Sequence, residues 1–282
     1  MVQDYFNLQT GLPFMILDGK PIAKEMLEEL RKSVSEFGKL TMVSVAYEED
    51  QESIVYFNSI KKNAEKVGIN FVPLVIKGEE LMNIIAKLND DSAVNSVIVG
   101  RPFPKGIKNE MVSEALDPDK DADCITYQNM GQLYFGVERI TPATPRASID
   151  ILKYYGVDLK GKSILVINRS VTVGRPLSQM LLNRDATVTI AHSKTRNIEE
   201  LIESSDVVFL AVAKAGFLKA STIKSKKIVV DIGINVVEGK VMGDFEMDAE
   251  NHLVDYTPVP GGVGAVTSVE ILKNALELAK CQ

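Results

Sequence analysis

The 282-residue sequence predicts an α/β protein with two domains and mostly parallel sheets. Segments typical of strands and helices alternate from end to end, as expected where crossover helices join parallel strands. Loops between residues 100 and 146 interrupt this alternation once, and the length suits one large or two medium domains.

The first alternating set covers residues 21–99. An amphipathic pattern predicts a helix at 21–37, followed by a strand at 40–46 and a helix at 52–67, for which Gly68 provides the stop. The set is completed by strand 70–76, helix 79–89 and strand 95–99.

A second set begins after a Pro- and Gly-rich loop at 100–107, an acidic loop at 117–123 and the segment TPATPR at 141–146. The two prolines of TPATPR favour a domain boundary there. The second set comprises strands near 163–167, 187–191, 207–212 and 228–232, with helices near 174–183 and 197–204.

A terminal helix at 266–280 follows the loop TPVPGGVG and has no strand after it. We therefore expect it to pack back on the first domain. The expected domains are residues 1–140 plus 265–282, and residues 141–264.

Composition excludes several classes of protein. A net charge of −6 argues against general nucleic-acid binding, no apolar run reaches the ~18 residues of a membrane span, and the N-terminus lacks the apolar core of a signal peptide. Two distant cysteines fit reduced thiols in a cytoplasmic protein, and two histidines exclude a multi-histidine metal site.

Residues 163–176, SILVINRSVTVGRP, are typical of a phosphate-binding corner. An apolar strand ends at the polar turn Asn168-Arg169-Ser170, and a helix follows at Gly174. A helix N-terminus presents unpaired N–H groups and a positive dipole to an anion. Because the usual glycine-rich motif is absent, a strand–helix corner without any ligand is the alternative.

The next strand ends at His192 and continues Ser193-Lys194-Thr195-Arg196. An acid near this point would bind the ribose 2′-hydroxyl of NAD, whereas hydroxyl and basic groups suit the 2′-phosphate of NADP. Together with Arg169, this segment favours NADP; a solvated basic loop is the alternative.

Ordered motifs extend over nearly the whole chain from Ile16 onward. As a set they resemble the methylenetetrahydrofolate dehydrogenase/cyclohydrolase family of one-carbon enzymes. The matching segments are ILDGKPIA (16–23), S-x-x-Y with EKVGI (53–69), RPFPKGI (101–107), DPDKDAD (117–123), TPATP (141–145), NRSVTVGRP (168–176), HSKT (192–195), DIGIN (231–235) and TPVPGGVG (257–264).

The resemblance implies an N-terminal α/β catalytic domain, a Rossmann-like NADP-binding domain, a folate cleft between them and a homodimer. The family oxidises 5,10-methylenetetrahydrofolate to the methenyl form, and commonly hydrolyses that to 10-formyltetrahydrofolate. The nucleotide residues implied are Asn168, Arg169, Ser170, Gly174, Ser193 and Thr195, with Ile234 beside the nicotinamide.

On the folate side, the resemblance places Tyr56 against the flat substrate and Asp123 on the N–H edge of the pterin. An aromatic platform and a carboxylate suit those two tasks. A core tyrosine and a turn-forming aspartate are the alternatives. Pro102, Gly261 and Gly262 are the other substrate-binding residues implied.

The chain departs from the family at the positions tied to hydrolysis. The family lysine four residues after the tyrosine is Ile60 here, and the family glutamine is Gly100. Lys61 lies about 100° round a helix from the missing lysine, so it substitutes only if the helix shifts or its stem bends back. Arg101 offers a cation from the loop but is too basic to act as a general base.

Three hypotheses follow from these residues. The favoured one is an NADP-dependent methylenetetrahydrofolate dehydrogenase with weak or no cyclohydrolase activity. The second is the full bifunctional enzyme, with Lys61 or Arg101 recruited for hydrolysis. The third is a non-catalytic NADP-binding protein.

Overall fold

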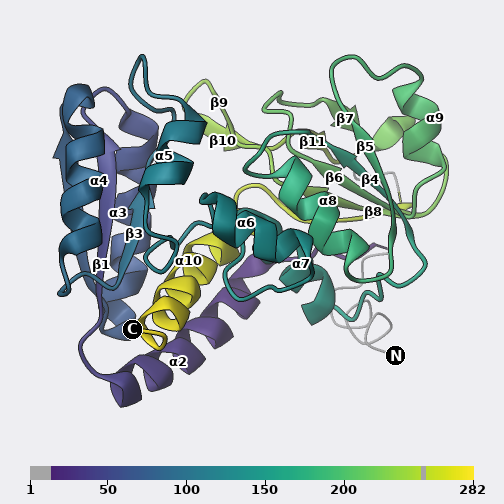
Figure 1. Ribbon diagram of the computed structural model, residues 1–282. Helices are drawn as coiled ribbons and strands as arrows, with labels where there is room; N and C mark the ends of the chain where they lie inside the picture. Colours follow the sequence, from purple (N-terminus) through teal and green to yellow (C-terminus); the bar gives the residue numbers. More distant parts are fainter. Residues whose placement is uncertain (1–13, 249–251) are drawn as a thin grey trace. The chain divides into compact units, whose positions relative to one another are not determined.

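The computed structural model describes residues 14–248 and 252–282, and the chain divides into two compact units (Figure 1). The first unit comprises Lys24–Ala143 and Ser268–Gln282. The second comprises Thr144–Thr267 together with residues 14–23. Both are built on parallel sheets, which confirms the predicted α/β class.

The sheet of the first unit has three parallel strands in the order β2-β1-β3. Its buried core joins Val43, Val45 and Val97 from the strands to Ile85 and Leu88 from a covering helix. The elements are α2 (Gly19–Phe37), β1 (Thr41–Tyr47), α3 (Gln51–Val67), β2 (Asn70–Ile76), η1 (Gly78–Glu80), α4 (Leu81–Asp90) and β3 (Ser96–Val99).

The ends of α3 follow from local chemistry. At its start, the carboxylate of Asp50 accepts a hydrogen bond of 3.0 Å from the backbone N–H of Ser53, as an N-cap does. At its end, Gly68 adopts φ 86°, a left-handed conformation that glycine takes without a Cβ penalty. The predicted stop at Gly68 is confirmed.

Three helices lie in segments for which the sequence predicts no element. The first two are short, which leaves little periodicity to detect, and the third carries Pro145 in its first turn, where proline costs no backbone hydrogen bond. The TPATPR segment therefore enters a helix instead of forming an extended crossing. The three are α5 (Asn109–Ala115), α6 (Tyr127–Tyr134) and α7 (Ala143–Tyr154).

The five-stranded parallel sheet of the second unit has the order β12-β8-β6-β4-β5. The chain passes from β4 to β5 on one side and then returns to β6 on the other. Ligands of open α/β sheets bind at such a reversal, beyond the carboxyl ends of the strands. The strands are β4 (Ser163–Ile167), β5 (Thr187–Ala191), β6 (Val207–Leu210), β8 (Lys227–Asp231) and β12 (Val254–Tyr256).

Two helices and two small strand pairs complete the second unit. Helix α8 packs beside β4 and β5 (Figure 1). None of the helices in the described residues is long and apolar enough to cross a bilayer. The remaining elements are α8 (Gly174–Leu182), α9 (Ile198–Glu203), η2 (Ala220–Thr222), the parallel pair β7 (Leu218–Lys219) and β11 (Phe245–Glu246), and the hairpin β9 (Asn235–Val237) and β10 (Lys240–Met242).

The terminal helix α10 (Val263–Ala279) packs on the first unit, as the sequence predicts. The buried amide of Asn274 donates to the carbonyl oxygens of Ala122 and Thr141, at 2.8 and 2.7 Å. Asn63 of α3 donates to the hydroxyl of Ser268 at 2.9 Å. The final residues of the chain thus complete the core that the first hundred residues begin.

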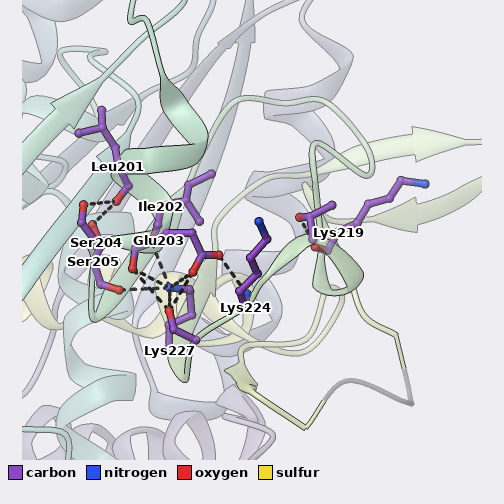
Figure 2. A network of polar contacts seen from close by, with 10 residues as sticks. Leu201, Ile202, Glu203, Ser204, Ser205, Lys219, Lys224 and Lys227 are labelled. Carbon is purple, nitrogen blue, oxygen red and sulfur yellow. Dashed lines mark hydrogen bonds and ion pairs between the residues drawn. The ribbon is translucent and has the colours of Figure 1, made fainter.

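Each unit contains a buried lysine that binds carbonyl groups at the end of a helix. Lys227 of β8 donates to the carbonyl of Ile202 at 3.1 Å and to the hydroxyl of Ser225 at 2.9 Å (Figure 2). The carboxylate of Glu203 lies 3.9 Å from the Lys227 amine. Lys120 contacts the carbonyls of Leu88, Asn89 and Asp91, each at 2.7 Å. A cation suits these positions because the last carbonyls of a helix have no partner within it.

Candidate functional site

The second unit contains a cavity of about 500 Å³ at the reversal of its strand order. Its walls come from the segments that follow β4, β5 and β6. The lining residues are Ile167, Asn168, Arg169, Ser170, His192, Ser193, Thr195, Ile198, Ala211, Val212, Lys214 and Phe217.

Asn168 fixes the turn after β4. Its side-chain oxygen accepts the N–H groups of Ser170 and Gly174, at 2.7 and 3.0 Å, while its Nδ2 donates to the carbonyl of Ala211 at 2.6 Å. A Cβ on Gly174 would lie 2.1 Å from the Asn168 carbonyl oxygen, so only glycine fits the start of α8. Asn168 therefore ties together two walls of the cavity.

The first N–H groups of α8 are bonded within this turn. The N–H of Arg175 donates to the carbonyl of Ser170 at 3.0 Å, and that of Val173 to the Ser170 hydroxyl at 3.0 Å. The sequence predicts that the helix N-terminus receives the anion, but these two groups and the Gly174 N–H already have partners. An anion in this cavity would instead meet the exposed Arg169 side chain and the hydroxyl-rich segment after β5.

The segment after β5 is closed by its own hydrogen bonds. The N–H of His192 donates to the Thr195 hydroxyl at 2.9 Å, and the N–H of Thr195 returns to the His192 carbonyl at 2.8 Å. Ser193 lies between them on the cavity wall. Three hydroxyl residues, Ser170, Ser193 and Thr195, and two cations, Arg169 and Lys214, thus line one cavity, and such a set suits a phosphate group.

Two predicted nucleotide residues within the described part of the chain do not line the cavity. Gly174 lies behind it, at the start of α8, where it allows the tight turn. Ile234 lies on the turn between β8 and β9 with 63% of its surface exposed. The structure brings the other five together: Asn168, Arg169, Ser170, Ser193 and Thr195.

The first unit brings together Tyr56, Asp123 and Arg101. Burial raises the pKa of Asp123 to about 7, although the positive charge of Arg101 and the N–H of Ala143 act in the opposite direction. Burial and then the Asp123 charge raise the pKa of Tyr56 above its usual range. Tyr56 comes from α3 and Asp123 from the acidic loop, so residues 67 positions apart share one electrostatic environment.

The backbone of Arg101 is hydrogen-bonded to Ser53 of α3. Its N–H donates to the Ser53 hydroxyl at 3.1 Å, and the same hydroxyl donates to its carbonyl at 3.2 Å. The guanidinium lies 5.0 Å from the centre of the Phe103 ring, and its buried Nε has no hydrogen-bond partner among the described residues. Pro102, joined to Arg101 by a cis peptide bond, is exposed.

The two positions that the resemblance associates with hydrolysis carry no polar side chain. Ile60 is completely buried, and Phe57 and Ala64 of the same helix are buried as well. Gly100 packs so closely that a Cβ would lie 2.7 Å from the Ser53 side chain and 3.1 Å from Asp50 Oδ2. Lys61 is half-buried on the next position of α3, and Tyr56 is half-buried on the same helix.

Gly261 and Gly262 belong to the second unit. Other parts of the chain lie close to the positions where their side chains would be. The carbonyl of Gly261, at φ 111°, accepts the N–H of Gly19 at 2.9 Å. A Cβ on Gly262 would lie 2.6 Å from the Pro258 carbonyl oxygen. The close backbone contacts of these two glycines lie within the protein, and their role in binding the substrate stays a prediction.

Sequence reasoning did not identify the wall formed by Ala211, Val212, Lys214 and Phe217. A signal was present, because the strand predicted at 207–212 neighbours the strand at 163–167 in any parallel sheet of this order. In the described residues there is no group of three or more His, Cys, Asp or Glu side chains arranged to hold a metal ion.

Comparison with known proteins relates both halves of the chain to one family. Residues 17–123 match the model for the tetrahydrofolate dehydrogenase/cyclohydrolase catalytic domain, and residues 142–282 match that for the family's NAD(P)-binding domain. The bifunctional protein FolD of Thermotoga maritima is 40% identical over 271 residues, which cover 95% of this chain and 99% of that protein.

Two solved structures extend the comparison. The bifunctional FolD of Campylobacter jejuni superposes with a TM-score of 0.89 at 33% identity, covering 95% of this chain and 99% of that one. The FolD of Trypanosoma brucei, solved with NADP and an inhibitor, has a TM-score of 0.88 at 31% identity, with 95% and 98% coverage.

Proposed function

Because this chain belongs to the tetrahydrofolate dehydrogenase/cyclohydrolase family, we propose that it oxidises 5,10-methylenetetrahydrofolate to the methenyl form and passes a hydride to NADP. The cavity of the second unit carries the proposal. It combines Arg169 and Lys214 with the hydroxyls of Ser193 and Thr195 at the reversal of the strand order. These groups complement a 2′-phosphate, which NAD lacks.

Hydride transfer of this kind needs no protein acid, only two rings held at near-attack distance. On the folate side, Tyr56 supplies an aromatic face, and the ionised carboxylate of Asp123 accepts hydrogen bonds from the N–H edge of the pterin. Arg101 favours that form because its charge lowers the pKa of Asp123. On the nucleotide side, Ile234 is the apolar residue beside the nicotinamide.

We further propose that hydrolysis of the methenyl product is weak or absent. Activation of a water needs a polar group in place of Ile60, which is completely buried. A glutamine does not fit at Gly100 without displacing Ser53 or Asp50. The methenyl form would therefore leave as the product.

One observation favours a second candidate, the complete bifunctional enzyme. Arg101 places a positive charge beside Asp123, and its buried Nε has no partner among the described residues. In that case Arg101 would orient the attacking water or bind the oxygen that this water adds to the methenyl carbon.

Both reactions should be measured on a single preparation, with NAD and NADP, and with the Thermotoga maritima FolD alongside as a hydrolysis control. We expect NADP-dependent formation of the methenyl product and hydrolysis of added methenyltetrahydrofolate at the buffer rate. Hydrolysis well above that rate, lost in R101M and retained in K61M, would establish the second candidate. Absence of both activities, with NADP still bound, would leave a non-catalytic NADP-binding protein.

We also propose a cytoplasmic homodimer formed through the second unit. Ile190 on the edge strand β5 exposes 42% of its surface, which supports a contact through that edge. Light scattering after size-exclusion chromatography should give twice the chain mass of 31.0 kDa. A single-chain mass at micromolar concentration would rule the dimer out.

A further inference from the structure

Two buried carboxylates lie behind the nucleotide cavity, and the proposed chemistry uses neither of them. Asp231 ends β8 and is 2% exposed, while Asp244 follows the β9–β10 hairpin and is 0% exposed. Two glycines make room for them. A Cβ on Gly233 would lie 2.1 Å from Asp244 Cγ, and one on Gly243 would lie 1.9 Å from Asp231 Oδ2.

Asp244 binds three consecutive N–H groups of the turn after β6. Its Oδ2 accepts from Val212 at 2.6 Å and Ala213 at 3.2 Å, and its Oδ1 accepts from Lys214 at 2.7 Å. Ala213 has φ 53°, a left-handed conformation unfavourable for alanine. Successive N–H groups in such a turn form an anion-binding concavity, and here the protein's own carboxylate fills it.

The same carboxylate also reaches the turn that carries Ile234. Asp244 Oδ1 accepts from Asn235 Nδ2 at 3.0 Å, while Asp231 Oδ1 accepts from the N–H groups of Gly233 at 2.9 Å and Asp244 at 3.1 Å. Both neighbours of Ile234 are thereby fixed, although Ile234 itself is exposed.

We infer that Asp244 is a positioning residue for the coenzyme: it holds the Val212–Lys214 wall of the cavity and, through Asn235, the turn that carries Ile234. The inference rests on the proposed NADP site. Val212 and Lys214 line the cavity and Asp244 does not, so Asp244 acts through them. Each carboxylate oxygen of Asp244 accepts hydrogen bonds from two N–H donors. In an asparagine, whichever way its amide is turned, the NH₂ group would face two of these donors and could accept from neither.

The test is equilibrium binding of NADPH, followed by its fluorescence, to wild type, D244N and D255N. Asp255 is the matched control because it is also a buried carboxylate of the second unit, but it accepts from Met15 and Lys226 instead of the cavity wall. We expect D244N to weaken NADPH binding by about tenfold, the equivalent of one hydrogen bond to a charged group. We expect D255N to bind like wild type.

Rescue distinguishes positioning from general loss of stability. A213G in the D244N background should recover part of the affinity, because glycine adopts φ 53° without the support of the carboxylate. In steady state, the KM for NADP should rise more than kcat falls. If D244N does not accumulate folded, N235A removes the amide donor to Oδ1, together with its 3.3 Å hydrogen bond to the Met242 carbonyl, and should weaken binding by a smaller factor.

A folded D244N that binds NADPH as tightly as wild type would overturn this inference while leaving the proposed function intact. Equal weakening in D255N would overturn it as well, since the effect would then be general. A wild-type protein that binds no NADPH would overturn the proposed function and this inference together.

Discussion

At the scale of single residues, the proposal that this chain oxidises its substrate without hydrolysing the product depends on a few side chains. Asp123 and Arg101 form a charge pair in the first unit, whereas Ile60 and Gly100 present no polar group where the family places its hydrolytic pair. The pKa of Asp123, raised to about 7, makes its charge depend on pH near neutrality. Folate affinity and stability should therefore respond to pH in opposite directions.

Replacement of Asp123 by asparagine should stabilise the protein at alkaline pH. The folded pKa of about 7 lies above the unfolded value of 3.8, so ionisation of Asp123 costs folding free energy above pH 7. That cost diminishes as pH falls from about 7 to about 4. Urea unfolding at pH 8 should show D123N more stable by at least about 1 kcal/mol, the equivalent of one pKa unit. A difference independent of pH would contradict this assignment.

Removal of the Arg101 charge should shift the pH dependence of folate binding. Arg101 lowers the pKa of Asp123, so in R101M this pKa rises and the carboxylate forms only at higher pH. The KM for methylenetetrahydrofolate should fall with rising pH in both proteins, with the midpoint displaced upward in R101M. R139M is the matched control, because Arg139 pairs with Asp119 at 2.9 Å on the surface. An unchanged midpoint in R101M would exclude this role.

At the scale of elements, a buried lysine binds the last carbonyl groups of a helix in each unit. Lys227 and Lys120 extend from other segments to the carbonyls at the ends of α9 and α4. Burial lowers the pKa of Lys227, and the charge of Glu203 opposes that shift. The charges near Lys227 therefore offset only part of the cost of burying its charge.

Lys227→Met should destabilise the second unit by about 2–4 kcal/mol, because buried carbonyls lose their donor. Lys219→Met is the control: Lys219 pairs with Glu246 at 3.2 Å, both side chains are more than half exposed, and the expected loss is below about 1 kcal/mol. Chemical denaturation followed by circular dichroism measures both. Equal losses would show that Lys227 is no more important than a surface lysine.

At the scale of the whole molecule, two units with separate parallel sheets share the chain, and the nucleotide cavity lies entirely in one of them. A ligand stabilises the structure that it binds by mass action. NADP should therefore act first on the five-stranded sheet and its connecting turns.

Saturation with NADP at a hundredfold excess over Kd should add about 2.7 kcal/mol to the unfolding free energy of the second unit. Hydrogen exchange should slow at residues 163–217, with a smaller change at residues 41–99. NAD at the same concentration should protect less. Slowing confined to residues 41–99 would place the coenzyme in the first unit and contradict this prediction.

Much of the fold could be predicted from periodicity. The strands at 163–167 and 187–191 have the predicted ends, and the stop at Gly68 is confirmed, because apolar runs and a left-handed glycine are local signals. Helices α5, α6 and α7 were not predicted, since short helices and an early proline leave little pattern. The roles of Tyr56, Asp123 and the nucleotide residues stay predictions.

The sequence by itself determined the alternation of strands and helices, the family motifs and the replacement of the hydrolytic pair by Ile60 and Gly100. Only the tertiary structure decided that Asn168 bonds to Ala211, that Lys214 lines the cavity and that Asp244 holds the turn behind it. The physical reason is sequence separation. Local propensity follows from neighbouring residues, whereas a carboxylate some 30 positions from its donors finds them only when the sheet has assembled.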